Sequence, residues 1–315
     1  MPSTEPHNAA EILCLGEAMV EFVRQPDGVT FRQGYGGDTS NAAIAAARQG
    51  GRVGYVTAVG TDRFGDDLVE LWQNEGIATD LVRRDPEAPT GIYFVDPDPA
   101  SRHFTYYRTG SAASRMASEG LDVARIGVAR VLHLSGITLA VSSDLRRTAF
   151  WAADAVASAG GTVSLDTNLR RQLWSVDEAR THLQAAATRA GIIVTSVDDQ
   201  QDLSGLSDPA EIAQALHVLG PGIVLVTLGG DGAWLSIEGQ GQLIPAAPAD
   251  PVDSTGAGDT FSGTFLTWWL ETGDPVLAAH RASVAAAATV SALGAIPAIP
   301  DRDHVVRTAR NLGRA

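Results

Sequence analysis

Short apolar strand patterns alternate with helical patterns through most of the 315 residues, and this alternation constrains the fold more than any other feature. The strand patterns fall at 11–15, 52–59, 130–135, 161–166, 191–195 and 222–228. The helical patterns fall at 39–49, 65–75, 142–159, 177–190, 208–219, 257–271, 275–292 and 302–311. Such alternation predicts an α/β fold in which helices cover both faces of a mostly parallel sheet. Ligands of such folds bind beyond the C-terminal ends of the strands.

Two segments, 17–36 and 88–110, interrupt this pattern because they have no helical period. Within the second segment, residues 90–95 and 103–108 are typical of strands, and the turn-rich stretch 96–99 separates them. We expect the two segments to form a small separate β-sheet that serves as a lid over the larger sheet.

Charge and cysteine content narrow the class of protein. The formal net charge of −14 argues against nucleic acid and anionic membranes as partners, since both require a basic surface. No apolar run reaches the roughly 20 residues needed to span a bilayer. Cys14 is the only cysteine and lies in an apolar run, so a buried strand residue is expected and no disulfide can form within the chain. We expect a cytoplasmic protein with a loose tail at 1–10 and a single domain at 11–315.

The stretch Asp253-Ser254-Thr255-Gly256-Ala257-Gly258-Asp259-Thr260-Phe261 is the most informative for chemistry. Its glycines open an apolar helix, and a helix start offers unpaired N–H donors and a positive dipole end to a phosphate. Asp259 follows in the first turn, where a carboxylate beside a phosphate is suited to accept a proton from an attacking hydroxyl. The alternative is a helix N-cap with an acid nearby.

All 23 basic residues are arginine, which limits how the chain can handle phosphate. Without lysine, the Walker loop, the protein-kinase strand lysine and Schiff-base chemistry are excluded. Backbone amides, arginine and a metal ion are the remaining means of binding phosphate.

Polar residues gather where predicted strands end. Asp166, Thr167 and Asn168 follow one strand, 196–199 follow the next, and 229–232 follow a third. The first group is as consistent with an Asx turn and a helix cap as with a site. The third group is typical of a hairpin loop.

Two other groups have both a functional and a structural interpretation. Tyr106 and Arg108 are two residues apart on a predicted strand, so they share a face that can bind a small polar ligand. Taken alone, the two residues favour the alternative of a solvated face with a surface arginine. Asp38 or Thr39 can cap the helix that follows Gly37. His133 lies in an apolar strand and is expected to be a core histidine.

These pieces occur in an order that resembles the ribokinase-like (PfkB) family of sugar kinases over about residues 11–300. The matching segments are 16–17, 36–41, 59–65 and 253–259. Within the family, the segments 90–93, 106–112, 133–138 and 166–174 are most similar to those of members that phosphorylate 2-keto-3-deoxygluconate.

The resemblance implies a three-layer α/β core with a β-sheet lid that is often used for dimerisation. It implies transfer of the γ-phosphoryl group of ATP to the 6-hydroxyl of 2-keto-3-deoxygluconate with Mg²⁺, and it leaves room for a monovalent cation. By resemblance, Asp259 is the general base and its neighbours Gly256, Ala257 and Gly258 form the anion hole. Substrate would be bound by Gly37, Asn41, Tyr93, Tyr106, Arg108 and Arg170, and nucleotide by Ser196, Thr227, Gly229 and Gly232 together with Gly256 and Gly258.

Two positions depart from the family pattern. Asp199, with Asp198 beside it, stands where the family usually has a glutamate near the metal, and Thr227 stands where related kinases often have lysine. We take Asp199 as the candidate metal ligand. The carboxylate of the acid sugar needs a compensating charge, and our hypothesis assigns this to Arg108 and Arg170. The alternatives are a kinase for fructose, ribose or 5-keto-2-deoxygluconate and a non-catalytic sugar- or nucleotide-binding protein.

Overall fold

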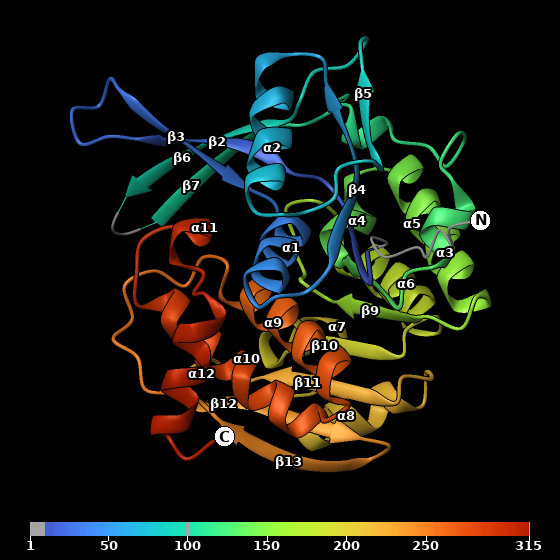
Figure 1. The fold of residues 1–315 in the computed structure, drawn as a ribbon, viewed down its shortest axis with the longest axis vertical. Coiled ribbons are helices and arrows are strands. Elements are labelled where there is room, and N and C mark those ends of the chain that lie inside the picture. The colour runs from blue at the N-terminus through green and yellow to red at the C-terminus, as the bar shows by residue number, and fades with distance from the viewer. Residues whose placement is uncertain (1–9, 99–100, 315) are drawn as a thin grey trace, which may run out of the picture.

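A computed structural model describes residues 10–98 and 101–314, so the expected tail at 1–10 lies outside the described residues except for residue 10. The described chain forms a large sheet covered by helices and a smaller sheet beside it (Figure 1). The predicted α/β fold with a separate small sheet is therefore confirmed.

The large sheet contains nine strands in the described residues, and all neighbours are parallel up to β11, after which β12 and β13 run antiparallel. In spatial order, they are β13 (Gln240–Pro245), β12 (Gly232–Ile237), β11 (Ile223–Thr227), β10 (Ile192–Ser196), β9 (Thr162–Asp166), β8 (Val131–Ser135), β1 (Ile12–Leu15), β4 (Val53–Gly60) and β5 (Val82–Asp85).

Both faces of the large sheet are buried, which explains why its inner strands are continuous apolar runs. Ile12 and Cys14 of β1 point into one core, whereas Leu13 and Leu15 point into the other. The first core is closed by α1 (Asp38–Arg48), α2 (Arg63–Asn74), α9 (Ala257–Thr272) and α10 (Pro275–Val290). The second face is covered by α4 (Gly136–Val141), α5 (Ser143–Ser158), α6 (Val176–Ala187), α7 (Val197–Leu203) and α8 (Pro209–His217). These three layers place Cys14 in a core, as expected.

Three shorter or peripheral helices complete the described chain: α3 (Val123–Gly127), α11 (Ala295–Ala298) and α12 (Arg302–Asn311). No described helix is long and apolar enough to cross a membrane.

The smaller sheet is the predicted lid, and it extends away from the large sheet (Figure 1). Its strands, in spatial order, are β3 (Phe31–Gly36), β2 (Met19–Arg24), β6 (Ile92–Asp98) and β7 (Ser101–Tyr107). The pairing of β2 with β6 is parallel, so residues 19–36 and 92–107, which are far apart in sequence, build one surface.

Some local expectations need correction. Helix α1 begins at Asp38 with Gly37 at the N-cap, and no side chain caps it, so neither Asp38 nor Thr39 has the expected capping role. Glycine is required there because φ of Gly37 is 128°. The predicted hairpin loop is confirmed, since residues 228–232 connect the antiparallel strands β11 and β12.

Candidate active site

A cleft of about 1070 Å³ lies between the lid and the C-terminal ends of β9, β10 and β11. The starts of α1 and α9 form part of its wall. Pockets for small molecules are usually roughly 300–1,000 Å³, so this cleft lies at the upper end of that range. Its position agrees with the ligand site expected for a parallel sheet covered by helices.

The start of α9 is open to the cleft. Gly256 is the N-cap with a left-handed φ of 78°, and no side chain caps the helix. A Cβ atom added at Gly256 would lie 2.7 Å from the Cβ of Ala295, whereas one added at Gly258 would meet no heavy atom within 4 Å. Within the described residues, the Gly258 amide has no protein acceptor. This helix start can therefore receive an anion through free backbone amides.

Ala257 contributes less to this cradle than the resemblance implies. It does not line the cleft, and its N–H donates to the carbonyl of Ser254 at 3.3 Å. The loop is held by Asp253, whose Oδ1 accepts from the Thr255 amide at 3.0 Å and whose Oδ2 accepts from the Gly294 amide at 3.0 Å. These bonds fix the loop before α9 without using the amide of Gly258.

Asp259 points from the first turn of α9 toward α1. Its Oδ2 accepts a hydrogen bond from Nδ2 of Asn41 at 2.8 Å, and both residues line the cleft. The two helices approach closely because α9 has Gly263 at the crossing, where an added Cβ would lie 2.1 Å from the carbonyl oxygen of Ala42. The Oδ1 atom of Asn41 is buried and has no donor among the described residues.

The surroundings of Asp259 make it a weak acid. Burial, and then the negative charge of Asp38, raise its pKa to about 7, while the Asn41 hydrogen bond and Arg170 act in the opposite direction. Burial also raises the pKa of Asp166 well above its ordinary range, and the carboxylates of Asp259, Asp199 and Asp38 add to this effect. A general base works best when its pKa is close to the working pH, so Asp259 is suited to that role.

Aromatic residues of the lid form the opposite wall of the cleft. The rings of Tyr93 and Tyr106 lie 5.6 Å apart, and the Tyr93 hydroxyl donates to Oε2 of Glu21 at 2.7 Å. Arg108 lies over the Tyr106 ring with its Cζ atom 5.7 Å from the centroid. The expected shared face of Tyr106 and Arg108 is therefore confirmed, but the interpretation of Arg108 as a surface residue is wrong, since only 9% of it is exposed.

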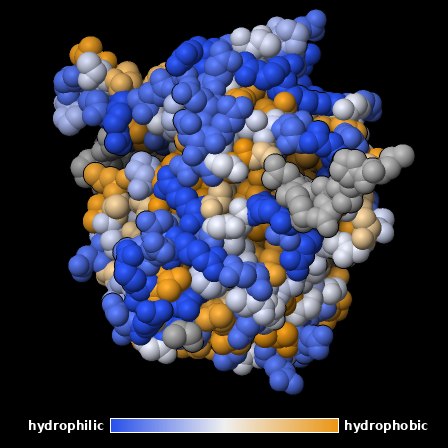
Figure 2. All heavy atoms as spheres, in the orientation of Figure 1, coloured by the Kyte–Doolittle hydropathy of each residue, from blue (hydrophilic) through white to orange (hydrophobic). Residues whose placement is uncertain are grey.

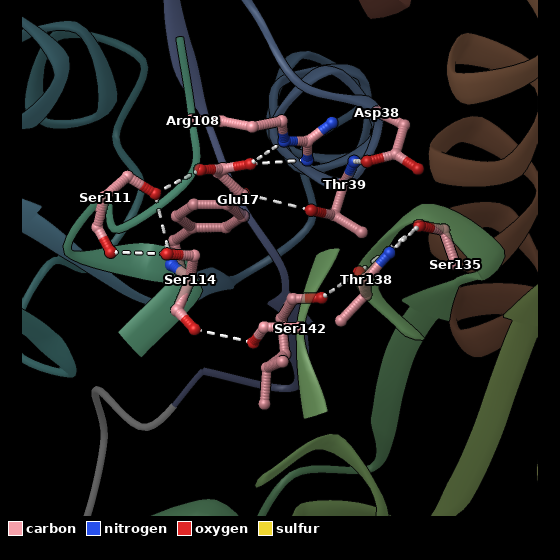
Figure 3. Close-up of polar contacts among 11 residues, drawn as sticks. Glu17, Asp38, Thr39, Arg108, Ser111, Ser114, Ser135, Thr138 and Ser142 are labelled. Atoms are coloured by element: carbon pink, nitrogen blue, oxygen red, sulfur yellow. Dashed lines mark hydrogen bonds and ion pairs between the residues drawn. The ribbon is translucent and has the colours of Figure 1, made fainter. Parts of the chain in front are cut away.

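Arg108 is paired with a buried carboxylate that the sequence did not reveal. Its Nε donates to Oε2 of Glu17 at 2.7 Å, and its Nη2 contacts the same oxygen (Figure 3). The Glu17 side chain has no exposed surface. This ion pair bears on the hypothesis that Arg108 supplies a compensating charge to the substrate, because an ionised Glu17 offsets the charge of Arg108.

Arg170, the other arginine of this hypothesis, is exposed. It lines the cleft, its Nη1 donates to the carbonyl of Leu169 at 3.0 Å, and no described acid forms an ion pair with it. Its positive charge lowers the pKa of Asp259 and of Asp166. Asn168, two residues before Arg170, donates its backbone N–H to Oδ1 of Asp166 at 3.2 Å, so the Asx turn is present, and both residues also line the cleft.

The nucleotide positions are only partly brought together. Ser196 and Thr227 line the cleft, but Gly229 and Gly232 lie in the following hairpin and do not line it. The Ser196 hydroxyl caps α7 by accepting from the Asp199 amide at 3.0 Å. Gly37 and Gly256, which were also predicted to bind ligands, line the cleft as well.

The donor set of the cleft fits a magnesium ion that arrives with nucleotide. Among the described residues, no group of three or more His, Cys, Asp or Glu side chains is arranged to hold a metal. Oδ2 of Asp199 accepts from the Thr167 hydroxyl at 2.8 Å and from the Leu169 amide at 3.1 Å, while Asp198 beside it is exposed. Mg²⁺ usually takes one or two carboxylates together with phosphates, and nine acids against five arginines line this cleft. A polyphosphate therefore needs a cation here.

Sequence reasoning gave no site role to Glu17, Glu21 or Asp38, which all line the cleft. Asp38 was expected only as a helix cap, and Glu17 stood out only as part of the segment 16–17 that matches the family and as an acid between β1 and β2. His133 is buried and contacts the Ser164 hydroxyl at 3.2 Å, which confirms the expected core histidine.

Comparison with known proteins shows similarity to sugar kinases over nearly the whole chain. Residues 9–302 match the family described as pfkB family carbohydrate kinase. The chain is 34% identical over 310 residues to the 2-dehydro-3-deoxygluconokinase of Thermoproteus tenax, covering 94% of this chain and 93% of the relative. It is 30% identical over 308 residues to a fructokinase of Vibrio alginolyticus, covering 94% and 98%. The structure of a fructokinase with bound ATP from Xylella fastidiosa has a TM-score of 0.88 at 28% identity, covering 96% and 98%.

Proposed function

Because the chain belongs to the pfkB family of carbohydrate kinases, we propose that it transfers the γ-phosphoryl group of ATP to the 6-hydroxyl of 2-keto-3-deoxygluconate, which is 2-dehydro-3-deoxygluconate. The observation that carries the proposal is the position of Asp259 at an open helix start, in a cleft that also contains the unpaired Arg170. The similarity to a relative named for this substrate supports the choice of sugar.

Asp259 acts as the general base in this proposal. Phosphoryl transfer depends on alignment and on neutralising charge more than on covalent chemistry. The carboxylate accepts the proton of the sugar hydroxyl as that oxygen bonds to phosphorus, and Asn41 keeps it oriented through its 2.8 Å hydrogen bond. The acceptor Oδ1 of Asn41, buried without a described donor, is suited to a hydroxyl of the sugar.

The helix start of α9 stabilises charge on the transferring group. Gly258 lines the cleft, and its amide has no acceptor among the described residues, so it can donate to a phosphoryl oxygen. Hydrogen-bond donors fixed in this way stabilise the developing charge without the free-energy cost of reorienting solvent during the reaction. The ATP polyphosphate would extend from this point toward Ser196 and Thr227, at the ends of β10 and β11.

Magnesium would be held by Asp199, with Asp198 beside it, together with the phosphates of ATP. When bound, the ion would supply positive charge that neutralises those phosphates. The surplus of acids over arginines in the cleft wall supports this requirement. A monovalent cation and a cytoplasmic location stay predictions.

Arg170 is the feature that favours an acid sugar over a neutral one. Its guanidinium has no acidic partner among the described residues, so it can pair with a substrate carboxylate through two hydrogen bonds. Fructose has no carboxylate and would leave that charge unused. Fructose remains the second candidate because of the similarity to a fructokinase.

A substrate panel tests the proposal. Purified protein is given ATP and Mg²⁺ with 2-keto-3-deoxygluconate, 5-keto-2-deoxygluconate, fructose or ribose, and ADP release is measured. We expect the highest kcat/KM for 2-keto-3-deoxygluconate. A higher kcat/KM for fructose would assign the protein to the second candidate, and no ADP release with any sugar would contradict a kinase.

The lid also supports a proposal of self-association. Its outer surface, at the upper left of Figure 2, exposes apolar side chains beside polar ones, and Val29, Phe31 and Tyr107 are 79%, 39% and 62% exposed. We propose a homodimer in which the two lids cover these side chains. Sedimentation equilibrium should give twice the chain mass, and Tyr107→Glu should shift the protein to monomer. A monomeric wild type at micromolar concentration would refute the dimer.

A further inference from the structure

Glu17 is a buried carboxylate at the edge of the cleft that the proposed reaction does not use. Its Oε2 accepts from Arg108 Nε at 2.7 Å, and its Oε1 accepts from the Ser111 hydroxyl at 2.6 Å. Both oxygens are therefore occupied by protein donors, and Figure 3 shows them between Arg108 and Ser111. A buried polar group whose hydrogen bonds are all satisfied is held rigidly in one orientation.

The support for Glu17 continues into the scaffold. The Ser111 amide donates to the carbonyl of Arg108 at 3.0 Å, and the Ser114 hydroxyl donates to the carbonyl of Ser111 at 2.8 Å. The hydroxyl of Ser142, which caps α5, donates to the carbonyl of Ser114 at 2.6 Å (Figure 3). The turn that holds Glu17 is thus fastened to a long helix of the core, so the carboxylate has little freedom to move.

The geometry of the pair determines what Arg108 can offer. Nε and Nη2 both face Glu17, so Nη1 is the guanidinium nitrogen directed away from it, as Figure 3 shows. Arg108 lines the cleft over the Tyr106 ring. The pair therefore presents an oriented N–H donor with no net charge, whereas Arg170 presents a net positive charge without an acidic partner among the described residues.

We propose that Glu17 is a positioning residue, which fixes Arg108 toward the carboxylate of the sugar and cancels its charge, so that Arg170 alone provides the net charge that selects an acid sugar. The inference rests on the proposed function, because it assigns residues to the acidic end of that substrate. The two arginines thus have different roles. Arg108 donates an oriented hydrogen bond to the substrate carboxylate, whereas Arg170 provides the net positive charge.

The variant Glu17→Gln tests the division of charge, because glutamine keeps the shape and the acceptor oxygen but removes the negative charge. We expect the ratio of kcat/KM for 2-keto-3-deoxygluconate to that for fructose to rise about 5-fold through a lower KM for the acid sugar, since one repulsive charge is lost. The value of kcat should stay within about 2-fold. An unchanged or lower ratio would overturn the proposal.

A matched control separates this effect from net charge. Glu271→Gln removes the acid of the Arg302 ion pair, whose atoms lie 2.6 Å apart outside the cleft. It should leave the ratio unchanged, and an equal rise in this control would overturn the proposal. Ser111→Ala keeps both charges and removes one hydrogen bond to Glu17. It should raise KM for the acid sugar several-fold without changing KM for ATP, and an unchanged KM would overturn the positioning role even if Glu17→Gln does not fold.

The wild type separates this inference from the proposed function. If the wild type phosphorylates fructose but not 2-keto-3-deoxygluconate, the proposed substrate is wrong. The inference is then judged by competitive inhibition with gluconate, an anionic sugar probe. Glu17→Gln should lower its inhibition constant about 5-fold relative to that of neutral glucitol, and equal constants in wild type and variant would overturn the role of Glu17.

Discussion

The carboxyl of Asp259 is surrounded by other acids, and this crowding determines when it can accept a proton. Burial and the charge of Asp38 raise its pKa to about 7, so the empty enzyme is half protonated there near neutral pH. A base must be ionised to work, and the protonated fraction grows as the pH falls. The ability of Asp259 to accept a proton therefore depends on the charge of Asp38.

The pH dependence of kcat/KM tests this coupling. Below about pH 7, kcat/KM should fall about tenfold for each pH unit, because it reports the pKa of the base in the free enzyme. Asp38→Asn should move the bend to lower pH, since the nearby negative charge is lost. If kcat/KM were constant between pH 5.5 and 8, no carboxyl with a raised pKa would act as the base in this reaction.

Arg170→Ala tests the charge that selects the substrate. We expect kcat/KM for 2-keto-3-deoxygluconate to fall about 10²-fold, because a charge-assisted pair is lost, while kcat/KM for fructose changes less than about 3-fold. Arg147→Ala, which removes an exposed arginine of α5 outside the cleft, is the charge control. Equal losses for both sugars in Arg170→Ala would contradict the assignment.

Residue roles could be predicted from the sequence only where neighbours along the chain define them. The open helix start with Asp259 depends on adjacent glycines, and it was predicted. The bond from Asn41 to Asp259 joins residues that are 218 positions apart, and the pair of Arg108 with Glu17 joins residues 91 apart. Spacing carries no information on such contacts, so the pairing of Arg108 with Glu17 could be found only from the structure.

At the level of elements, the start of α9 is shaped by two glycines with different tasks. Gly258 leaves the helix start open to the cleft, and Gly263 lets α1 and α9 approach. Gly258 therefore matters for ligand binding and Gly263 for helix packing. Alanine at position 258 should lower activity, whereas alanine at position 263 should lower stability.

Gly258→Ala should lower kcat about 10²-fold without loss of stability, because its methyl group would occupy the space meant for a phosphoryl group. Gly263→Ala should lower the free energy of unfolding by about 2 kcal/mol, because its methyl group would clash with the Ala42 carbonyl. Urea unfolding and ADP release measure both properties. Full activity in Gly258→Ala would remove the helix start from phosphoryl binding.

The strands and helices of the core were predicted to within a few residues because both faces of the sheet are buried and their patterns are strong. Most of the elements that were missed are peripheral or short, although β12 is a six-residue strand between β11 and β13. Strand β5 has four residues and two arginines, and β13 is an edge strand with mostly exposed residues. Helix α7 has seven residues with three acids. Their stability comes from tertiary neighbours rather than from a local pattern.

At the scale of the whole molecule, the buried His133 makes the folded protein less stable at acidic pH. Burial lowers the pKa of this histidine from 6.5 to about 4. The unfolded chain therefore binds a proton at a pH where the native protein does not, and stability falls as the pH decreases through that window. The cost applies to folding and leaves the chemistry of the cleft unaffected.

His133→Gln should remove this part of the pH dependence. Between pH 7.5 and 4.5, the wild type should lose about 2–3 kcal/mol more of its free energy of unfolding than the variant does. Urea unfolding at the two pH values measures the difference. The same pH dependence in both proteins would show that the histidine is protonated in the native core.

The proposed reaction requires the carboxyl of Asp259 to lie where the sugar hydroxyl meets the terminal phosphorus of ATP. The most direct measurement compares Asp259→Asn with wild type in turnover and in ATP binding by calorimetry. We predict that kcat falls by about 10²–10⁴-fold, while the Kd for ATP stays within about 3-fold because the residue acts on the hydroxyl. Turnover close to that of the wild type would contradict the central claim.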